Sequence, residues 1–177
     1  MPSNLAGAHL LREPATMSAM LELRRTTSAD LDFRALAQQL DADLHDRYGD
    51  DQDAYDEHNV LSSTDSVVLA FDDDRPVGCG AFRRLDGCDI ELKRMFVATS
   101  HRGRGIAGSV LTALEVWARE EGFRHAVLET GVRQSEAITL YRRAGYRVID
   151  NYGPFTGMPL SMCFAKTLMA DRIRPLS

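Results

Sequence analysis

The sequence predicts an α+β fold (an α/β three-layer arrangement) in which a mixed, mostly antiparallel sheet carries helices on both faces. Short turns, "DDDR" at 72–75 and "DG" at 86–87, separate strand-like runs and predict hairpins, which pair antiparallel. Two helical patterns, at 106–121 and 135–145, alternate with strands and require a parallel crossover. Among 177 residues, 44% are hydrophobic, which is enough for one compact domain with a real core.

The first third of the chain predicts a strand, a helix and a less regular segment. Residues 21–25 alternate like a strand, and "TTSAD" supplies capping residues before a helix that extends to Tyr48. The helix shows apolar spacing at Phe33, Leu36, Leu40 and Leu44. An acidic and aromatic stretch, "GDDQDAYDEHN", follows as either a helix or a loop.

The next strands are predicted at 66–71, 76–82 and 89–97. The last of these changes its two-residue period, because Ile90 and Leu92 keep one phase while Met95 and Val97 keep the other. One extra residue near Lys93 would produce this change, so we expect a β-bulge there. The alternative is a strand that is buried on both faces near its end.

The second half predicts two helix–strand units and a final strand. A helix begins at Ile106 and ends before Gly122, a strand covers 126–130, and a capped helix covers 135–145. Strands at 146–149 and 163–168 close the sheet. The connection between them carries Gly and Pro, which predicts a shaped loop rather than a plain hairpin turn.

Composition excludes several classes of protein. The net charge of −5 argues against general nucleic-acid binding, and no apolar run approaches the ~20 residues that span a membrane. Residues 1–20 do not resemble a signal peptide, so we expect a flexible extension, with Met17 and Met20 as alternative starts. Cys79, Cys88 and Cys163 lack metal spacing, which predicts buried reduced thiols, no metal and a cytoplasmic location.

The segment "SHRGRGIAGSV" (100–110) predicts an anion site. Glycine costs a helix about 1 kcal/mol relative to alanine, yet three glycines stand at a helix start, flanked by two arginines. Such a start exposes backbone N–H groups to an anion. A dinucleotide site, with Glu129 as the ribose-binding acid, fits less well because "ATSHR" separates the glycines from their strand. A plain glycine-rich turn with exposed arginines is the remaining alternative.

Two motifs, correctly ordered and spaced, resemble the GNAT N-acetyltransferase superfamily. The run "ELKRMFVATSHRGRGIAGSVL" is similar to its acetyl-CoA-binding core, whose Gln/Arg-x-x-Gly-x-Gly/Ala motif matches Arg102, Gly105 and Ala107. The run "QSEAITLYRRAGYRVI" resembles the second motif, with Gln134 standing where Asn is usual. The resemblance implies a GNAT-type sheet with a bulged fourth strand, in a domain over 21–170 followed by a tail at 171–177.

The resemblance also implies the cofactor, acetyl-CoA (coenzyme A), and its contacts. Backbone amides from Arg102 to Ala107 would hold the pyrophosphate, and the edge of the fourth strand would pair with the pantetheine arm. The implied cofactor-binding residues are Met95, Phe96, Val97, Arg102, Gly103, Arg104, Gly105, Ile106, Ala107, Gln134 and Tyr141.

Acetyl transfer to an amine needs a base, because an amine with a pKa near 10 is almost fully protonated at pH 7. Glu91 is the first candidate and Glu129 the second, with a water relay as an alternative. A solvated or Arg-paired strand residue is the other interpretation of Glu91. Tyr141 resembles the family's general acid, and a backbone N–H on the bulged strand is the expected oxyanion donor.

The expected acceptor is a primary amine of a small molecule or peptide. The acidic stretch borders the acceptor pocket in GNAT folds, where Tyr55, His58 and Glu129 would contact the substrate, and its charge would attract a cationic amine. A solvated charged face without a part in binding is the alternative interpretation of this stretch. We therefore expect a cytoplasmic acetyl-CoA-dependent N-acetyltransferase that acts by direct transfer and binds no nucleic acid or membrane. The sequence is compatible with a monomer or a homodimer. A non-catalytic acyl-CoA-binding or sensing module and a nicotinamide-dependent oxidoreductase are the alternatives.

Overall fold

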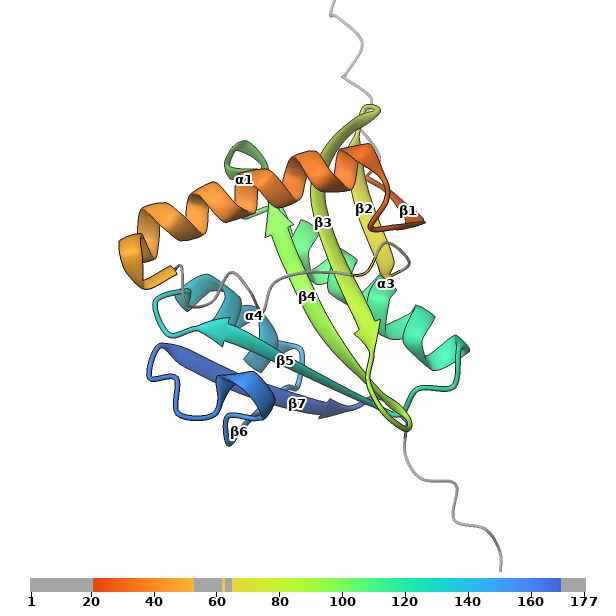
Figure 1. Ribbon diagram of the computed structural model, residues 1–177. Coiled ribbons are helices and arrows are strands. Elements are labelled where there is room, and N and C mark those ends of the chain that lie inside the picture. Colours follow the sequence, from red (N-terminus) through yellow and green to blue (C-terminus); the bar gives the residue numbers. More distant parts are fainter. Residues whose placement is uncertain (1–20, 53–61, 63–64, 170–177) are drawn as a thin grey trace, which may run out of the picture.

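The computed structural model describes residues 21–52, 62 and 65–169, and this part of the chain forms a single mixed sheet (Figure 1). The strands are β1 (Glu22–Thr27), β2 (Ser66–Asp72), β3 (Arg75–Arg84), β4 (Asp89–Val97), β5 (His125–Gly131), β6 (Arg147–Ile149) and β7 (Ser161–Thr167). Their spatial order is β1-β2-β3-β4-β5-β7-β6. Only β4 and β5 pair in parallel, so the predicted mixed, mostly antiparallel sheet is confirmed.

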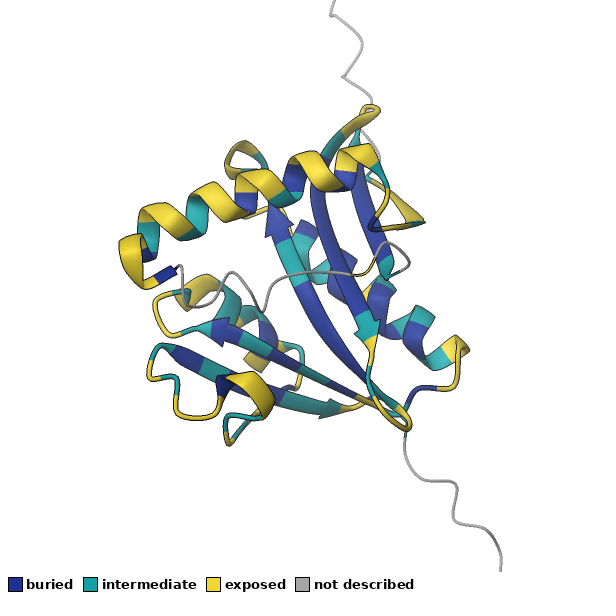
Figure 2. Cartoon of the chain, viewed as in Figure 1, coloured by how far each residue is buried: buried dark blue, intermediate teal, exposed yellow. Residues whose placement is uncertain are grey.

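Helices cover both faces of the sheet, as predicted. The helices are α1 (Leu31–Tyr48), α3 (Ile106–Glu120) and α4 (Ser135–Arg143), with short 3-10 turns η1 (Gly49–Gln52), η3 (Thr99–His101) and η4 (Gly153–Phe155). Val67 and Leu69 of β2 pack in the core under α1, whereas Val68 and Ala70 pack in the core under α3 and α4. The central strands are therefore buried on both sides along most of their length, and Figure 2 shows long dark blue stretches on β2, β3 and β4, with a teal interruption in β4.

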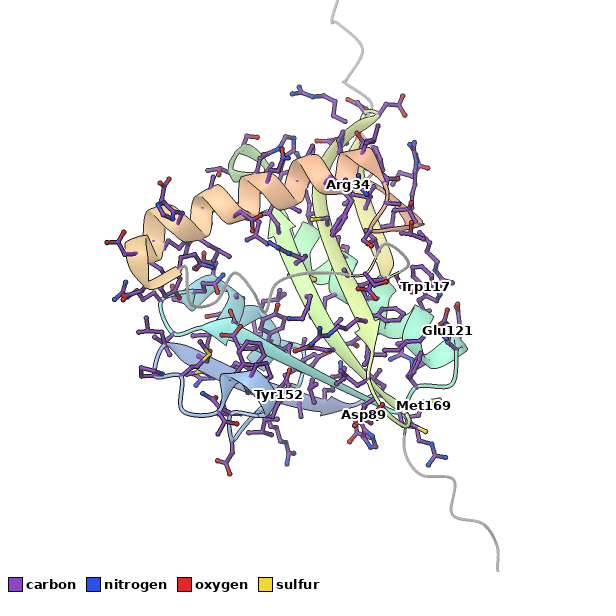
Figure 3. The ribbon with its side chains drawn as sticks, viewed as in Figure 1. Arg34, Asp89, Trp117, Glu121, Tyr152 and Met169 are labelled. Atoms are coloured by element: carbon purple, nitrogen blue, oxygen red, sulfur yellow. The ribbon has the colours of Figure 1, made fainter. Side chains whose placement is uncertain are left out.

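Local signals in the sequence fix the helix ends. Asp30 caps α1, because its carboxylate accepts hydrogen bonds from the backbone N–H groups of Asp32 and Phe33. Gly122 follows α3 with φ of 90°, as expected for a residue just beyond a helix C-terminus. Within α3, Trp117 packs edge-on against Phe82 and donates to Glu121, one turn further along (Figure 3).

The predicted bulge on β4 is present. Cys79 pairs with Phe96 and Ala81 pairs with Lys93, so Arg94 and Met95 both face the single residue Gly80 of β3. Arg94 adopts φ of 56° to accommodate the extra residue. As a result Leu92 packs on the α3 face while Phe96 packs on the α1 face, which is the change of phase seen in the sequence.

Strands β4 and β5 separate halfway along their length. Their parallel pairing runs from Asp89–His125 to Leu92–Leu128 and then stops, and Figure 1 shows the two strands diverging. The bulged half of β4 therefore presents an edge that β5 does not cover, and the candidate site lies in this opening.

The cysteines, the helices and the potential metal ligands bear on the expectations drawn from composition. Cys79 and Cys163 are buried and unpaired as predicted, but the expectation is wrong for Cys88, which is exposed in the turn before β4. Among the described residues, no helix combines the length and apolar character of a membrane span, and no group of three or more potential metal ligands occurs.

Candidate active site

A groove of about 310 Å³ lies between the free edge of β4 and the first turns of α3 and α4. We call it the β4–α3 groove. Among the predicted cofactor contacts it is lined by Met95, Phe96, Val97, Arg102, Gly103, Gly105, Ile106, Ala107, Gln134 and Tyr141. His101 and Gly108 line it as well, although neither was singled out from the sequence as a contact.

The glycine loop leaves this groove open and lined with backbone. Gly105 occupies the N-cap of α3 with φ of 79°, a left-handed conformation that strains any residue with a side chain. No side chain caps the helix start, so its first N–H groups remain available to an anion. A Cβ atom on Gly105 or Gly108 would meet nothing within 4 Å, so these glycines border free space rather than packed atoms.

The two arginines of the loop take different positions. Arg102 lines the groove, donates from Nε to the carbonyl oxygen of Val97 at 3.0 Å and lies 3.5 Å from Asp43 of α1. The guanidinium of Arg104 instead pairs with Asp72 of β2 at 2.8 Å. Of the predicted contacts, Arg104 alone does not line the groove.

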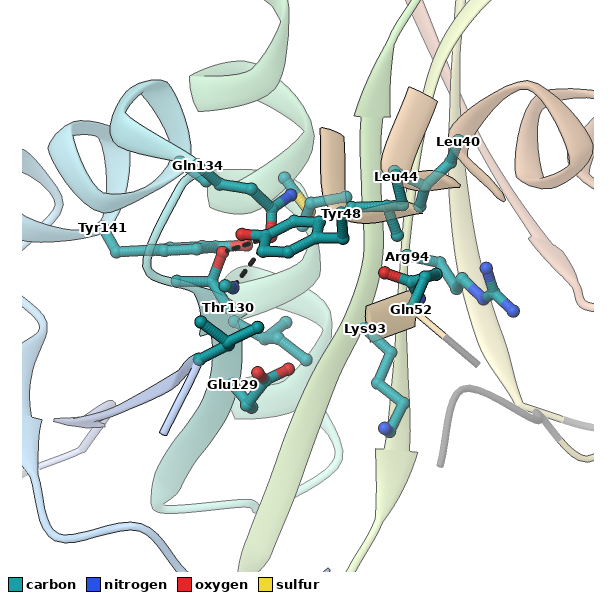
Figure 4. A pocket seen from close by; sticks show the side chains of 15 residues that line it. Leu40, Leu44, Tyr48, Gln52, Lys93, Arg94, Glu129, Thr130, Gln134 and Tyr141 are labelled. Atoms are coloured by element: carbon teal, nitrogen blue, oxygen red, sulfur yellow. Dashed lines mark hydrogen bonds between the residues drawn. The ribbon is translucent and has the colours of Figure 1, made fainter. Parts of the chain in front are cut away.

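A second, smaller cavity of about 90 Å³ continues from the groove into the opening between β4 and β5. We call it the β4–β5 pocket. Residues from α1, β4, β5 and α4 line it. Figure 4 shows Lys93 on β4 and Glu129 on β5, the two strands that separate here. Tyr141, Gln134 and Met95 line both spaces, so the groove and the pocket meet at these side chains.

Glu129 is the carboxylate that lines the pocket. Its Oε1 atom accepts a hydrogen bond of 2.7 Å from the Ser161 hydroxyl at the start of β7. Burial raises the pKa of Glu129 above its ordinary value, while the Ser161 hydrogen bond and the charge of Lys93 oppose that rise. A buried carboxylate that lines a pocket and has a raised pKa is a candidate for proton transfer.

Tyr141 projects from α4 to the junction of the two spaces. It is buried, and burial raises the pKa of its phenol well above the ordinary value, so the hydroxyl keeps its proton. Within the described part of the chain, this hydroxyl has no hydrogen-bond partner. It is therefore available to donate to a group in the groove.

Glu91 occupies a different environment from Glu129. Its side chain is 1% exposed, and Arg83 of β3 donates to its Oε2 atom at 2.5 Å. The Tyr152 hydroxyl donates to its Oε1 atom at 2.8 Å, and the Lys93 ammonium lies 3.7 Å from Oε2. Glu91 does not line the pocket, and both of its oxygens are engaged by donors.

The C-terminal end of α1 closes the pocket. The Tyr48 hydroxyl accepts a hydrogen bond from the Arg133 N–H at 3.0 Å, and a Cβ atom on Gly131 would lie 1.9 Å from that hydroxyl oxygen. The Gln134 side chain folds back to accept from the Gly131 N–H at 2.8 Å and from Thr130 at 3.0 Å. Tyr48 was not singled out from the sequence, because nothing local marks a helix-end tyrosine as a pocket wall.

The carboxylates of the second half of α1 and of the described part of the acidic stretch are partly neutralised by arginines. Asp41 pairs with Arg94, Asp43 with Arg47 and Arg102, and Asp51 with Arg133. Tyr55 and His58, the predicted substrate contacts, lie outside the described residues.

Comparison with known proteins identifies the family. A model of the Acetyltransferase (GNAT) family matches residues 33–146. The "IAA acetyltransferase" of Azospirillum brasilense is 35% identical over 135 residues, which cover 75% of this chain and 88% of that protein. The crystal structure of a Klebsiella pneumoniae protein assigned as an acyl-CoA N-acyltransferase superposes with a TM-score of 0.72 at 30% identity, over 85% of this chain and 99% of that one.

A more distant structure shares the fold. The GNAT family acetyltransferase of Elizabethkingia anophelis, solved with acetyl-CoA bound, has a TM-score of 0.60 at 18% identity over 83% of this chain and 97% of that one. The open β4–α3 groove fits the same cofactor, because it offers uncapped helix N–H groups and a free strand edge. The chain therefore belongs to the GNAT acetyltransferase family and is an acetyl-CoA-dependent acetyltransferase.

Proposed function

We propose that the protein transfers the acetyl group of acetyl-CoA directly to a primary amine of a small molecule or peptide, with Glu129 as general base and Tyr141 as general acid. The observation that carries the proposal is the position of Tyr141, which lines both the groove and the pocket. A group there can reach the sulfur of a thioester held in the groove while the amine waits in the pocket.

The cofactor contacts follow from the groove. The N–H groups at the start of α3 and the Arg102 guanidinium would hold the pyrophosphate, and the β4 edge at Met95–Val97 would pair with the pantetheine arm. Bound acetyl-CoA supplies an acetyl thioester, whose carbon is open to attack by an amine. A backbone N–H of the bulge would donate to the carbonyl oxygen as negative charge develops on it.

The protons balance with these two residues. An ammonium entering the pocket gives one proton to Glu129, which returns it to solvent. Glu129, ionised again, takes the second proton from nitrogen as the N–C bond forms and the C–S bond breaks, while the leaving thiolate takes a proton from Tyr141. The second proton then returns through solvent to the Tyr141 phenolate, so the products are the amide, the CoA thiol and one proton released to solvent. The Tyr141 phenol is a weaker acid than the CoA thiol, but it stays protonated at rest. Burial of the CoA thiolate favours the neutral thiol, which helps the transfer of the proton from Tyr141.

Two features support Glu129 over Glu91 as the base. Glu129 lines the pocket and accepts one side-chain hydrogen bond, whereas Glu91 lies behind the pocket with two donors on its oxygens. The assignment of Glu91 as the base stays a prediction. Glu91→Gln tests it, because this variant should lose the acid limb of the pH–rate profile only if Glu91 is the base.

An amine panel with detection of released CoA thiol tests the proposed function. The panel contains spermidine, phenethylamine, glutamate and a tripeptide with a free N-terminus, at low and high salt. We expect release with at least one amine, loss of that release in Tyr141→Phe, and better use of cationic than anionic acceptors. If acetyl-CoA binds but no amine accelerates release, the chain is a non-catalytic acyl-CoA-binding module. A cytoplasmic location, with acetyl-CoA and reduced thiols at hand, belongs to the same proposal.

A further inference from the structure

A long connection, residues 150–160 between β6 and β7, lies beside the pocket. Two of its aromatic side chains turn inward: Phe155 is fully buried, and Tyr152 packs edge-on against it with ring centroids 5.7 Å apart. Figure 3 shows Tyr152 at the β6–β7 end of the sheet. The Lys93 ammonium of β4 lies 5.5 Å from the centre of the Phe155 ring, so the connection rests on β4.

Glu91 is the polar anchor of this contact. It receives the Tyr152 hydroxyl on one oxygen and the Arg83 guanidinium on the other, at a site almost without solvent. A buried carboxylate held by a charged donor and a hydroxyl has little freedom to move. The three residues come from β3, β4 and the connection, and they join these elements at one point.

The far end of the same connection reaches the pocket. Leu160 lines the pocket and its carbonyl oxygen accepts from the Val132 N–H at 2.8 Å. The next residue, Ser161, donates to Glu129. Asn151, beside Tyr152, donates to the carbonyl oxygens of Met158 and Ser161, and so ties the two ends of the connection together.

From this arrangement we infer that Glu91 is a positioning residue, which acts with Arg83 and Tyr152 to fix the 150–160 connection and thereby holds Ser161 in its hydrogen bond to Glu129. The inference rests on the proposed role of Glu129 as the base. It assigns Glu91 a function at a distance from the reacting atoms, through a chain of contacts that ends at the Ser161 hydroxyl.

The charged and titratable groups around Glu129 set the direction of the effect. The Ser161 hydrogen bond and Lys93 lower the pKa of Glu129, while burial and the charge of Glu91 raise it. Loss of the Ser161 hydrogen bond must therefore raise the pKa of Glu129. Tyr152→Phe removes one neutral hydroxyl, but it also frees an oxygen of Glu91, whose charge acts on Glu129. A shift at Glu129 can therefore pass either through the connection or through the charge of Glu91, and the two routes have to be separated.

The test is a titration of the Glu129 carboxylate by carbon-13 NMR, with its signal assigned by its absence in Glu129→Gln. Ser161→Ala should raise the midpoint by about one pH unit, the size expected for one hydrogen bond to a charged group. Tyr152→Phe should raise it by about half as much. Thr156→Val is the matched control, because Thr156 lies exposed on the same connection and bonds only the Asn151 carbonyl there.

The double variant Tyr152→Phe/Ser161→Ala decides whether the effect passes through Ser161. We expect the same midpoint as Ser161→Ala alone, because a shift that passes through the Ser161 hydroxyl is lost with it, whereas a shift that passes through the charge of Glu91 adds to it. An unchanged midpoint in Tyr152→Phe, or full additivity in the double variant, overturns the inference. Thermal unfolding of each variant confirms that it is folded at the temperature of the titration.

This titration reads Glu129 without an acceptor or a turnover. If the amine panel releases no CoA, the proposed function fails while the titration still reports on the connection. If the panel succeeds and Tyr152→Phe leaves Glu129 unchanged, only the inference about Glu91 fails.

Discussion

The β4–α3 groove and the β4–β5 pocket are neighbours that share Tyr141, yet they are built in opposite ways. The groove is lined largely by one continuous segment, from Met95 to Gly108, whose second half leaves backbone accessible at Gly103, Gly105 and Gly108. The pocket is assembled from residues of α1, β4, β5 and α4 and from Leu160 in the connection before β7. A continuous segment can recognise one constant ligand, whereas an assembled wall can change residue by residue with the acceptor.

Tyr141→Phe tests the point where the two regions meet and should have the largest effect. We expect kcat to fall by about 10²- to 10⁴-fold, because the phenyl ring fills the same space but cannot donate a proton. The dissociation constant of acetyl-CoA, measured by calorimetry, should hardly change. Full activity in the folded variant would remove Tyr141 as the acid.

Glu91→Ala tests whether the wall of the pocket depends on its buried network. Removal of one partner leaves Arg83 and Tyr152 without their acceptor and should cost about 3–5 kcal/mol of the free energy of unfolding. Urea unfolding measures this. Glu120→Ala is the control, because Glu120 forms an exposed, solvent-screened pair with Arg25 and its removal should hardly change the free energy of unfolding. Equal costs would mean that Glu91 is no anchor.

Arg102→Ala tests the groove alone. Loss of its charge-assisted contact should weaken acetyl-CoA binding by about 1–3 kcal/mol in calorimetry, with no change in the acceptor's KM. Arg104→Ala is the matched neighbour and should weaken binding less, since its guanidinium pairs with Asp72 outside the groove. A larger effect at Arg104 would show that this side chain moves to the phosphates when the cofactor binds.

Glu129→Gln tests the pocket through stability alone and should change the free energy of unfolding by the smallest amount. We expect that free energy to rise. Because burial raises the pKa of Glu129 in the folded state, ionisation costs stability as pH rises from the ordinary value of 4.5 through the raised one. Glutamine removes that cost, so the variant should be more stable than the parent above this window and equal to it below. Denaturant unfolding at pH 4 and pH 8 measures the difference, and a less stable variant at pH 8 would contradict it.

The difference between the regions also explains what the sequence could predict. The strand turns, the change of phase at Lys93 and the glycines at 103 and 105 are local signals, and they predicted the hairpins, the bulge and the open groove. The burial of Glu91 depends on Tyr152, 61 residues further along the chain, and no local pattern marks that contact. An acidic residue in a strand is as compatible with a base as with an Arg-paired anchor.

Positions 48 and 131 each constrain which side chains the other can carry. A side chain at 131 would meet the Tyr48 hydroxyl at 1.9 Å, so even alanine there must displace the ring that closes the pocket. The reverse order is free of this conflict, because a smaller residue at 48 first creates the room that a later substitution at 131 requires. A side chain at 131 is therefore accommodated most easily after position 48 has become smaller, and we expect substitutions at this wall of the pocket to be tolerated in that order.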